Sequence, residues 1–63
     1  MDKYILIGTP DNQIDFNVYA TGANEVQMDI SMTLRCGQYD LYLGLDDAKK
    51  LKDFFANLPL DQF

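Results

Sequence analysis

The chain has 63 residues, with ten acidic and five basic side chains that give a formal net charge of −5, and it contains no histidine. This charge argues against direct binding to DNA or RNA, because affinity for phosphate backbones depends on clustered Lys and Arg. The single cysteine, Cys36, excludes an intrachain disulfide, and without histidine there is no Cys/His set for a structural zinc. Residues 1–63 therefore make one small domain with a marginal core, and we expect a homodimer to supply further burial.

Four stretches have the composition or the alternation of β-strands. Residues 3–7 are a short apolar run of strand formers, and residues 14–20 alternate strictly between apolar and polar side chains. The longest alternation covers residues 25–35, and a fourth covers residues 39–45. The connections between them are short and rich in Gly, Pro, Asn and Asp, so consecutive strands should be antiparallel neighbours, because a parallel crossover needs about a dozen residues or more.

From Asp46 onward the spacing becomes helical, which predicts a helix over residues 46–58. Its apolar stripe is Ala48, Leu51, Phe54, Phe55 and Leu58. Asp46 is the expected N-cap, and Pro59 is expected to end the helix and begin a short tail, 59–63. The predicted fold is α+β, a four-stranded antiparallel β-meander with one C-terminal α-helix packed on one face (ββββα) and with Phe55 in its core.

Few residues of the chain could support catalysis. Cys36 has no histidine to act as its base, and no phosphate-binding glycine motif is present. Asp15, Asp29 and Asp40 could flank a substrate or bind Mg²⁺ or Ca²⁺, but acids are expected on the wet face of an antiparallel sheet, and nothing in the sequence indicates a cleft. We therefore expect no enzymatic activity, no cofactor and no metal site.

The sequence lacks the features of membrane insertion and export. No apolar run approaches the roughly 18 residues of a membrane span. The N-terminus lacks the charged start, apolar stretch and small-residue cleavage site of a signal peptide. We expect a cytoplasmic protein without membrane contact.

The outward side of the predicted sheet is both acidic and aromatic, a composition typical of protein interfaces. One apolar pair of residues 3–7 must also face outward, either Tyr4 with Leu6 or Ile5 with Ile7, because one helix covers only one face. The tail offers an alternative binding surface through Leu60 and Phe63. The candidate partner-binding residues on the sheet are Asp15, Asn17, Tyr19, Asp29, Arg35, Asp40 and Tyr42.

The negative charge is concentrated in the predicted sheet: residues 1–45 hold six acids and two bases, while residues 46–63 hold four acids and three bases. We therefore expect a protein that binds and inhibits or regulates another protein through a basic, nucleic-acid-binding surface of that partner. In size and charge the chain is similar to the small acidic proteins that bacteriophages encode against host nucleases and defence systems, although this resemblance includes no motif. The alternative is a structural or assembly protein whose free sheet face makes only a homo-oligomer.

Overall fold

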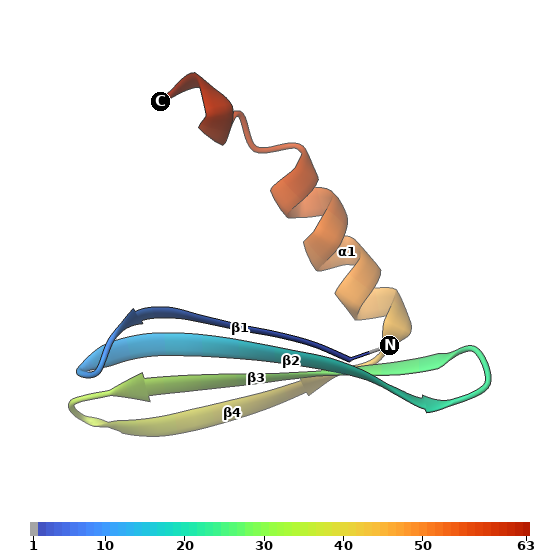
Figure 1. Ribbon diagram of the computed structural model, residues 1–63, viewed down its shortest axis with the longest axis horizontal. Coiled ribbons are helices and arrows are strands. Elements are labelled where there is room, and N and C mark those ends of the chain that lie inside the picture. The colour runs from blue at the N-terminus through green and yellow to red at the C-terminus, as the bar shows by residue number, and fades with distance from the viewer. Residues whose placement is uncertain (1) are drawn as a thin grey trace.

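The computed structural model describes residues 2–63 and confirms the predicted ββββα fold (Figure 1). The strands form one antiparallel sheet in the order β1-β2-β3-β4, and a single helix, α1, follows them. A one-turn 3₁₀ helix lies in the tail, at Leu60–Gln62. The elements have the bounds β1 Asp2–Thr9, β2 Asn12–Gly22, β3 Glu25–Leu34, β4 Gly37–Leu43 and α1 Leu45–Ala56.

The strand register divides the sheet into two chemically different faces. One row across the four strands is Ile5, Phe16, Ile30 and Leu41, and the next row is Leu6, Asp15, Ser31 and Asp40. Successive side chains of a strand point to opposite faces, so these rows lie on opposite sides of the sheet.

We call the side on which α1 lies the apolar face and the other side the polar face. The apolar face carries Ile5, Ile7, Ile14, Phe16, Val18, Met28, Ile30, Met32, Tyr39, Leu41 and Leu43. The polar face carries Asp2, Tyr4, Leu6, Asp15, Asn17, Tyr19, Gln27, Asp29, Ser31, Asp40 and Tyr42. The register thus answers the question that the sequence left open, because it is Tyr4 and Leu6 of β1 that share the polar face.

Two backbone positions fix the first two hairpins. Gly8 has a φ of 110°, and a Cβ atom at this position would collide with the carbonyl oxygen of Asn12 on β2. Asn24 in the β2–β3 turn has a φ of 61°, a left-handed conformation that asparagine tolerates better than most residues. These turns set the register, and a slip of one residue would exchange the two faces of a strand.

Helix α1 begins one residue earlier than the sequence predicted, and its N-cap is Gly44 rather than Asp46. Gly44 has extended backbone angles and makes no side-chain cap, whereas Asp46 and Asp47 lie within the first turn. There their charges are favoured by the positive end of the helix dipole. The helix ends at Ala56, and the backbone N–H and the side-chain amide of Asn57 both donate to the carbonyl oxygen of Asp53, at 3.2 and 2.8 Å.

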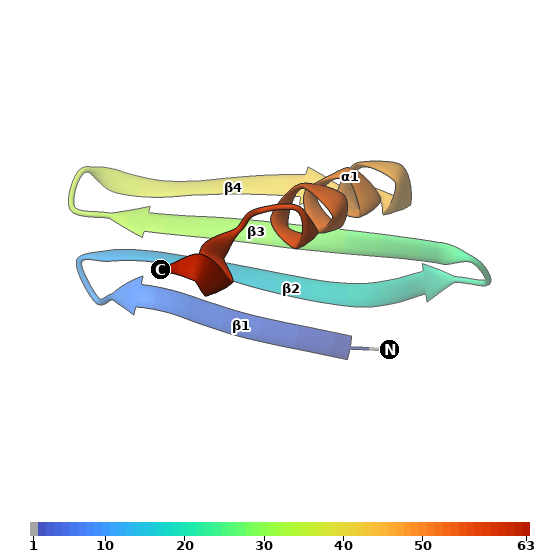
Figure 2. The same cartoon turned by 90° about the horizontal axis from the view of Figure 1, so that it is seen from above.

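The helix covers only part of the apolar face. It contacts β3 and β4, and it rises away from the sheet toward its C-terminus (Figures 1 and 2). Among residues 2–63 only Ala48, near the start of α1, is buried, with 8% of its surface exposed. Phe55 is 52% exposed, so the expectation that Phe55 belongs to the core is wrong for the single protomer. Leu51 and Phe55 of the stripe line a groove together with side chains of the sheet, but the C-terminal half of α1 stands off from the sheet (Figure 1).

Candidate functional site

The centre of the polar face is organised by Asp29 on β3. The hydroxyl of Tyr19 donates to Oδ2 of Asp29 at 3.0 Å, and Nε2 of Gln27 donates to its Oδ1 at 2.6 Å. Tyr19 and Gln27 face each other across the β2–β3 pair, so both reach the same carboxylate from one row away. The two bonds fix the carboxylate and the phenol ring in one geometry.

A second carboxylate of the polar face is held in the same way. Oγ of Ser31 donates to Oδ1 of Asp40 at 2.6 Å, across the β3–β4 pair. Asp15 lies in this row on the other side of Ser31. The positions of Asp15 and Asp40 are therefore two strand spacings apart, about 10 Å. Together with Asp2 at the edge strand, these carboxylates give the polar face four negative charges.

The hydrogen bond to Asp29 also changes the titration of Tyr19. The pKa of the Tyr19 phenol is raised above its ordinary value, first because its proton is held by Asp29, and then because of partial desolvation and the negative charge of Asp29. The proximity of Tyr42 adds a smaller increase in the same direction. Tyr19 is therefore a neutral hydrogen-bond donor at physiological pH.

Two of the three tyrosines of the polar face, Tyr4 and Tyr42, lie on its edge strands. Tyr4 on β1, Asn17 on β2, Asp29 on β3 and Tyr42 on β4 form one row across the sheet. Both tyrosines and Leu6 are largely exposed, and Asn17 is exposed between them. Sequence reasoning assigned Tyr42 to this surface but left Tyr4 and Leu6 undecided, because residues 4–7 are apolar without alternation.

Two sequence-predicted groups lie away from the centre of the polar face. Arg35 is in the turn between β3 and β4, and its Nη2 donates to Oδ2 of Asp11 in the β1–β2 turn at 3.2 Å. The structure thus places Arg35 at one end of the sheet, in an exposed ion pair. Leu60 and Phe63 are in the tail beyond α1, where both are exposed, and the backbone N–H of Phe63 donates to the carbonyl oxygen of Leu60 at 3.2 Å.

The structure offers little geometry for chemistry within residues 2–63. No three Asp, Glu, His or Cys side chains in this range are grouped closely enough to hold a metal ion. Cys36 is exposed in the β3–β4 turn. Across the same residues, no helix combines the length and the apolar character that a membrane crossing requires.

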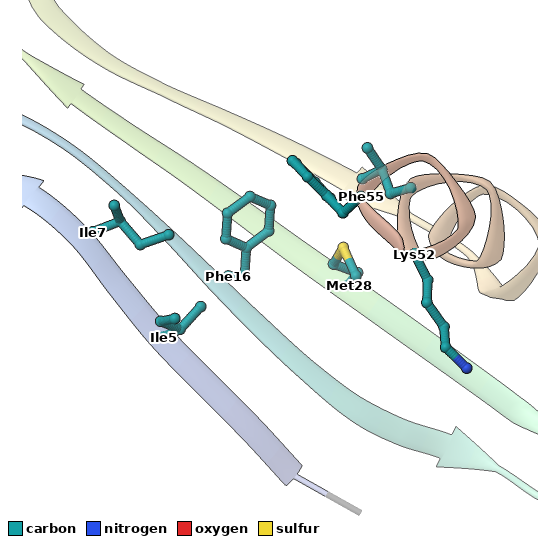
Figure 3. Close-up of a pocket in the computed structure, with 7 residues that line it drawn as sticks. Ile5, Ile7, Phe16, Met28, Lys52 and Phe55 are labelled. Carbon is teal, nitrogen blue, oxygen red and sulfur yellow. The ribbon is translucent and has the colours of Figure 1, made fainter. Parts of the chain in front are cut away.

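On the apolar face, an open groove lies on each side of α1, and sequence reasoning missed both grooves. The first has a volume of about 300 Å³ and lies between α1 and the first three strands, where Figure 3 shows Ile5, Ile7 and Phe16 to one side of Phe55, with Met28 nearer to the helix. The second, about 600 Å³, lies on the β3–β4 side and includes Ile30, Met32 and Leu41. The grooves could have been predicted from the width of the helix, because a helix about 10 Å across cannot cover four strands that are about 4.8 Å apart.

No family model matches the sequence, and comparisons with curated proteins and with solved structures find no significant match.

Proposed function

We propose that this chain is a non-enzymatic protein-binding domain that inhibits or regulates its partner, and that the polar face docks on a basic protein surface. The observation that carries the proposal is the set of four aspartates on one sheet face, with Asp29 and Asp40 held by hydrogen bonds from neighbouring side chains. Rows of fixed carboxylates complement a cationic surface, and such complementarity speeds association and selects the partner.

The basic surface that fits best is one that normally holds nucleic acid. Its cations are spaced for the regular charges of a phosphate backbone, and carboxylates spaced along and across strands present negative charge over a comparable flat area. By occupying that surface the domain would block nucleic-acid binding, which is the mode of action of an inhibitor of a nuclease or of a nucleic-acid-directed defence system.

The tyrosines of the polar face support protein rather than small-molecule binding. Tyr4, Tyr19 and Tyr42 lie among the carboxylates of the polar face, and tyrosine is enriched where interfaces exclude water. Tyr42 is largely exposed and offers apolar area for contact. In this assignment the carboxylates steer the encounter, and the tyrosines slow dissociation.

The test compares two charge reversals of equal size. Replacing Asp15 and Asp40 by Lys changes the net charge of the chain from −5 to −1 through two positions on the polar face. Replacing Asp53 and Asp61 by Lys makes the same change in net charge through positions on the helix and tail. We substitute Asp15 rather than Asp29, because a change at Asp29 would also remove the hydrogen bonds from Tyr19 and Gln27.

Each protein is coupled to beads through Cys36, the only thiol, and exposed to a bacterial lysate at increasing salt concentrations. We expect the wild type and the Asp53/Asp61 variant to retain one stoichiometric, salt-sensitive partner, and the Asp15/Asp40 variant to lose it. Equal loss by both variants would show that only net charge matters, and would refute a docking role for the polar face.

The second candidate function is a structural or assembly protein, favoured by the open grooves of the apolar face. This candidate requires self-association and no other partner. In the same experiment it predicts that no stoichiometric protein is retained by any of the three baits at low salt.

A further inference from the structure

The single protomer exposes more surface than a compact protein of its size. Its accessible surface is 5202 Å², whereas a compact monomer of 7.2 kDa exposes about 4,100 Å². Its radius of gyration is 13.3 Å, against about 10.6 Å expected for a compact chain of 63 residues. The excess area, about 1,100 Å², is larger than the roughly 800 Å² that each partner contributes to a standard interface.

A large apolar part of the exposed surface lies on the apolar face and on α1. There Ile5, Ile7 and Leu41 are each about half exposed, and on α1 both Phe54 and Phe55 are more than half exposed. The two phenylalanine rings lie edge to face with centroids 5.5 Å apart, and α1 makes no close approach to β1 or β2. To be buried, a sheet face of this composition requires an apolar surface of similar area packed against it.

A second copy of the chain matches this face in shape. The chain carries both halves of a self-complementary contact. One is the exposed aromatic pair Phe54 and Phe55 on α1, and the other is the open apolar groove of about 300 Å³ between α1 and the first three strands, of which Phe55 forms one wall. In a two-fold pair each helix can place its aromatic pair against the partner's uncovered strands, and both contacts form at once.

Charge also selects the face for self-association. The polar face carries four aspartates and no basic residue, so two polar faces brought together would repel one another. On the other side of the sheet, Lys3 and the helix contribute four lysines against three aspartates, a net charge of +1. Two copies can therefore meet there with little electrostatic cost.

We infer that the protein is a two-fold homodimer whose core forms between the apolar faces of two chains, with the helices packed between the two sheets. Both polar faces then point outward on opposite sides of the dimer and remain free for other contacts. This inference stands independently of the proposed function, since it concerns the opposite face of the sheet.

Two neighbouring residues of β1 provide a matched test. Ile5 on the apolar face is 52% exposed and Leu6 on the polar face is 51% exposed. The two residues therefore lie on opposite faces of the sheet but have nearly the same exposed fraction. Mass is measured for the full chain by sedimentation equilibrium from nanomolar to high micromolar concentrations. We expect the wild type and Leu6→Lys to have twice the chain mass of 7.2 kDa.

Ile5→Lys should raise the dimer dissociation constant by about 100-fold or more, because the interface contains two copies of each residue. If Ile5→Lys does not fold while Leu6→Lys does, the test is made on the wild type instead. The unfolding temperature of a wild-type dimer must rise with chain concentration.

Several results would overturn the inference. These are a folded wild type of monomer mass, an assembly of three or more chains, an unfolding temperature independent of concentration, or dissociation caused by Leu6→Lys and not by Ile5→Lys. A monomer that instead binds lipid vesicles or another protein through Ile5 would assign the apolar face to that occupant.

Discussion

The two faces of this sheet are built by the same alternation of side chains, yet they differ in what they require from their surroundings. Ile5 and Leu6 are adjacent and almost equally exposed, but Leu6 lies beside Asp15, whereas Ile5 belongs to an apolar row that crosses all four strands. An isolated apolar side chain on a polar surface is ordinary, while a contiguous apolar patch marks a contact surface. The exposed fraction of one residue therefore says less than the identity of its neighbours across the strands.

The polar face is complete within one protomer. Its central carboxylates, Asp29 and Asp40, accept hydrogen bonds from Tyr19, Gln27 and Ser31 of the same chain. The apolar face is incomplete, because α1 contacts only β3 and β4, and open grooves remain on both sides of it. In so small a chain the hydrophobic stabilisation of one protomer is limited, and stability should therefore respond strongly to changes on the apolar face and weakly to changes on the polar face.

The largest effect is expected from Phe55→Ala. If Phe55 is covered by a second chain, its truncation should lower the free energy of unfolding by about 3 kcal/mol at a fixed chain concentration, the lower end of the range for a buried Phe. Urea denaturation followed by circular dichroism measures this change. Lys49→Ala, on the same helix and exposed, is the control and should stay within about 0.5 kcal/mol of the wild type. A Phe55→Ala protein as stable as that control would mean that Phe55 is exposed to water in solution.

Alternation predicted the faces of β2, β3 and β4 correctly because a period of two can be read directly from residues such as Ile14, Asp15 and Phe16. It could not place β1, where residues 4–7 are all apolar. In β1, the face to which each side chain points is set by the register of the β1–β2 hairpin, which begins with the pair Thr9 and Asn12. This register depends on the turn and not on the alternation of residues. The helix was found from its apolar stripe, but its N-cap was misassigned, since Asp46 has an ideal side chain while the backbone turns at Gly44.

The candidate site residues were predicted as members of one face, and the register brings most of them together there. Their hydrogen bonds could not be read from the sequence, because Tyr19 and Asp29 are ten positions apart and meet only through the β2–β3 register. The burial of Phe55 was overestimated for a different reason. A helical stripe indicates which side of a helix is apolar, but it does not specify whether the covering atoms belong to the same chain.

A smaller effect is expected at Gly8, where the β1–β2 hairpin fixes which side chains of β1 reach each face. Gly8→Ala adds a Cβ that meets the carbonyl oxygen of Asn12, and it forces an L-residue to a φ of 110°. We expect a loss of about 1–3 kcal/mol, measured as a lower unfolding temperature at equal chain concentration. Gly44→Ser is the control, because Gly44 has open space around its Cα atom and serine is a favoured N-cap. A Gly8→Ala protein with unchanged stability would show that this turn does not constrain the register.

The smallest effect should be found on the polar face, in the titration of Tyr19. Its pKa is raised in the folded protein, so folding favours the protonated phenol. The stability that this provides is fully present below the ordinary tyrosine pKa of about 10, and it is lost as the pH rises through the higher pKa of the folded state. Asp29→Asn removes the charge that holds the proton, and the loss should then begin at a lower pH.

The phenolate absorbance near 295 nm reports this titration, and Tyr19→Phe, measured in parallel, isolates the contribution of Tyr19 from those of the other three tyrosines. We expect Tyr19 to ionise at a higher pH than an ordinary tyrosine in the wild type and to shift downward in Asp29→Asn. The dimer mass should be the same in both proteins at neutral pH, because the bond between Tyr19 and Asp29 lies on the face that we place outside the dimer. If Asp29→Asn dissociated the dimer, the self-association contact would lie on the polar face. The assignment of self-association to the apolar face and of partner binding to the polar face would then be wrong.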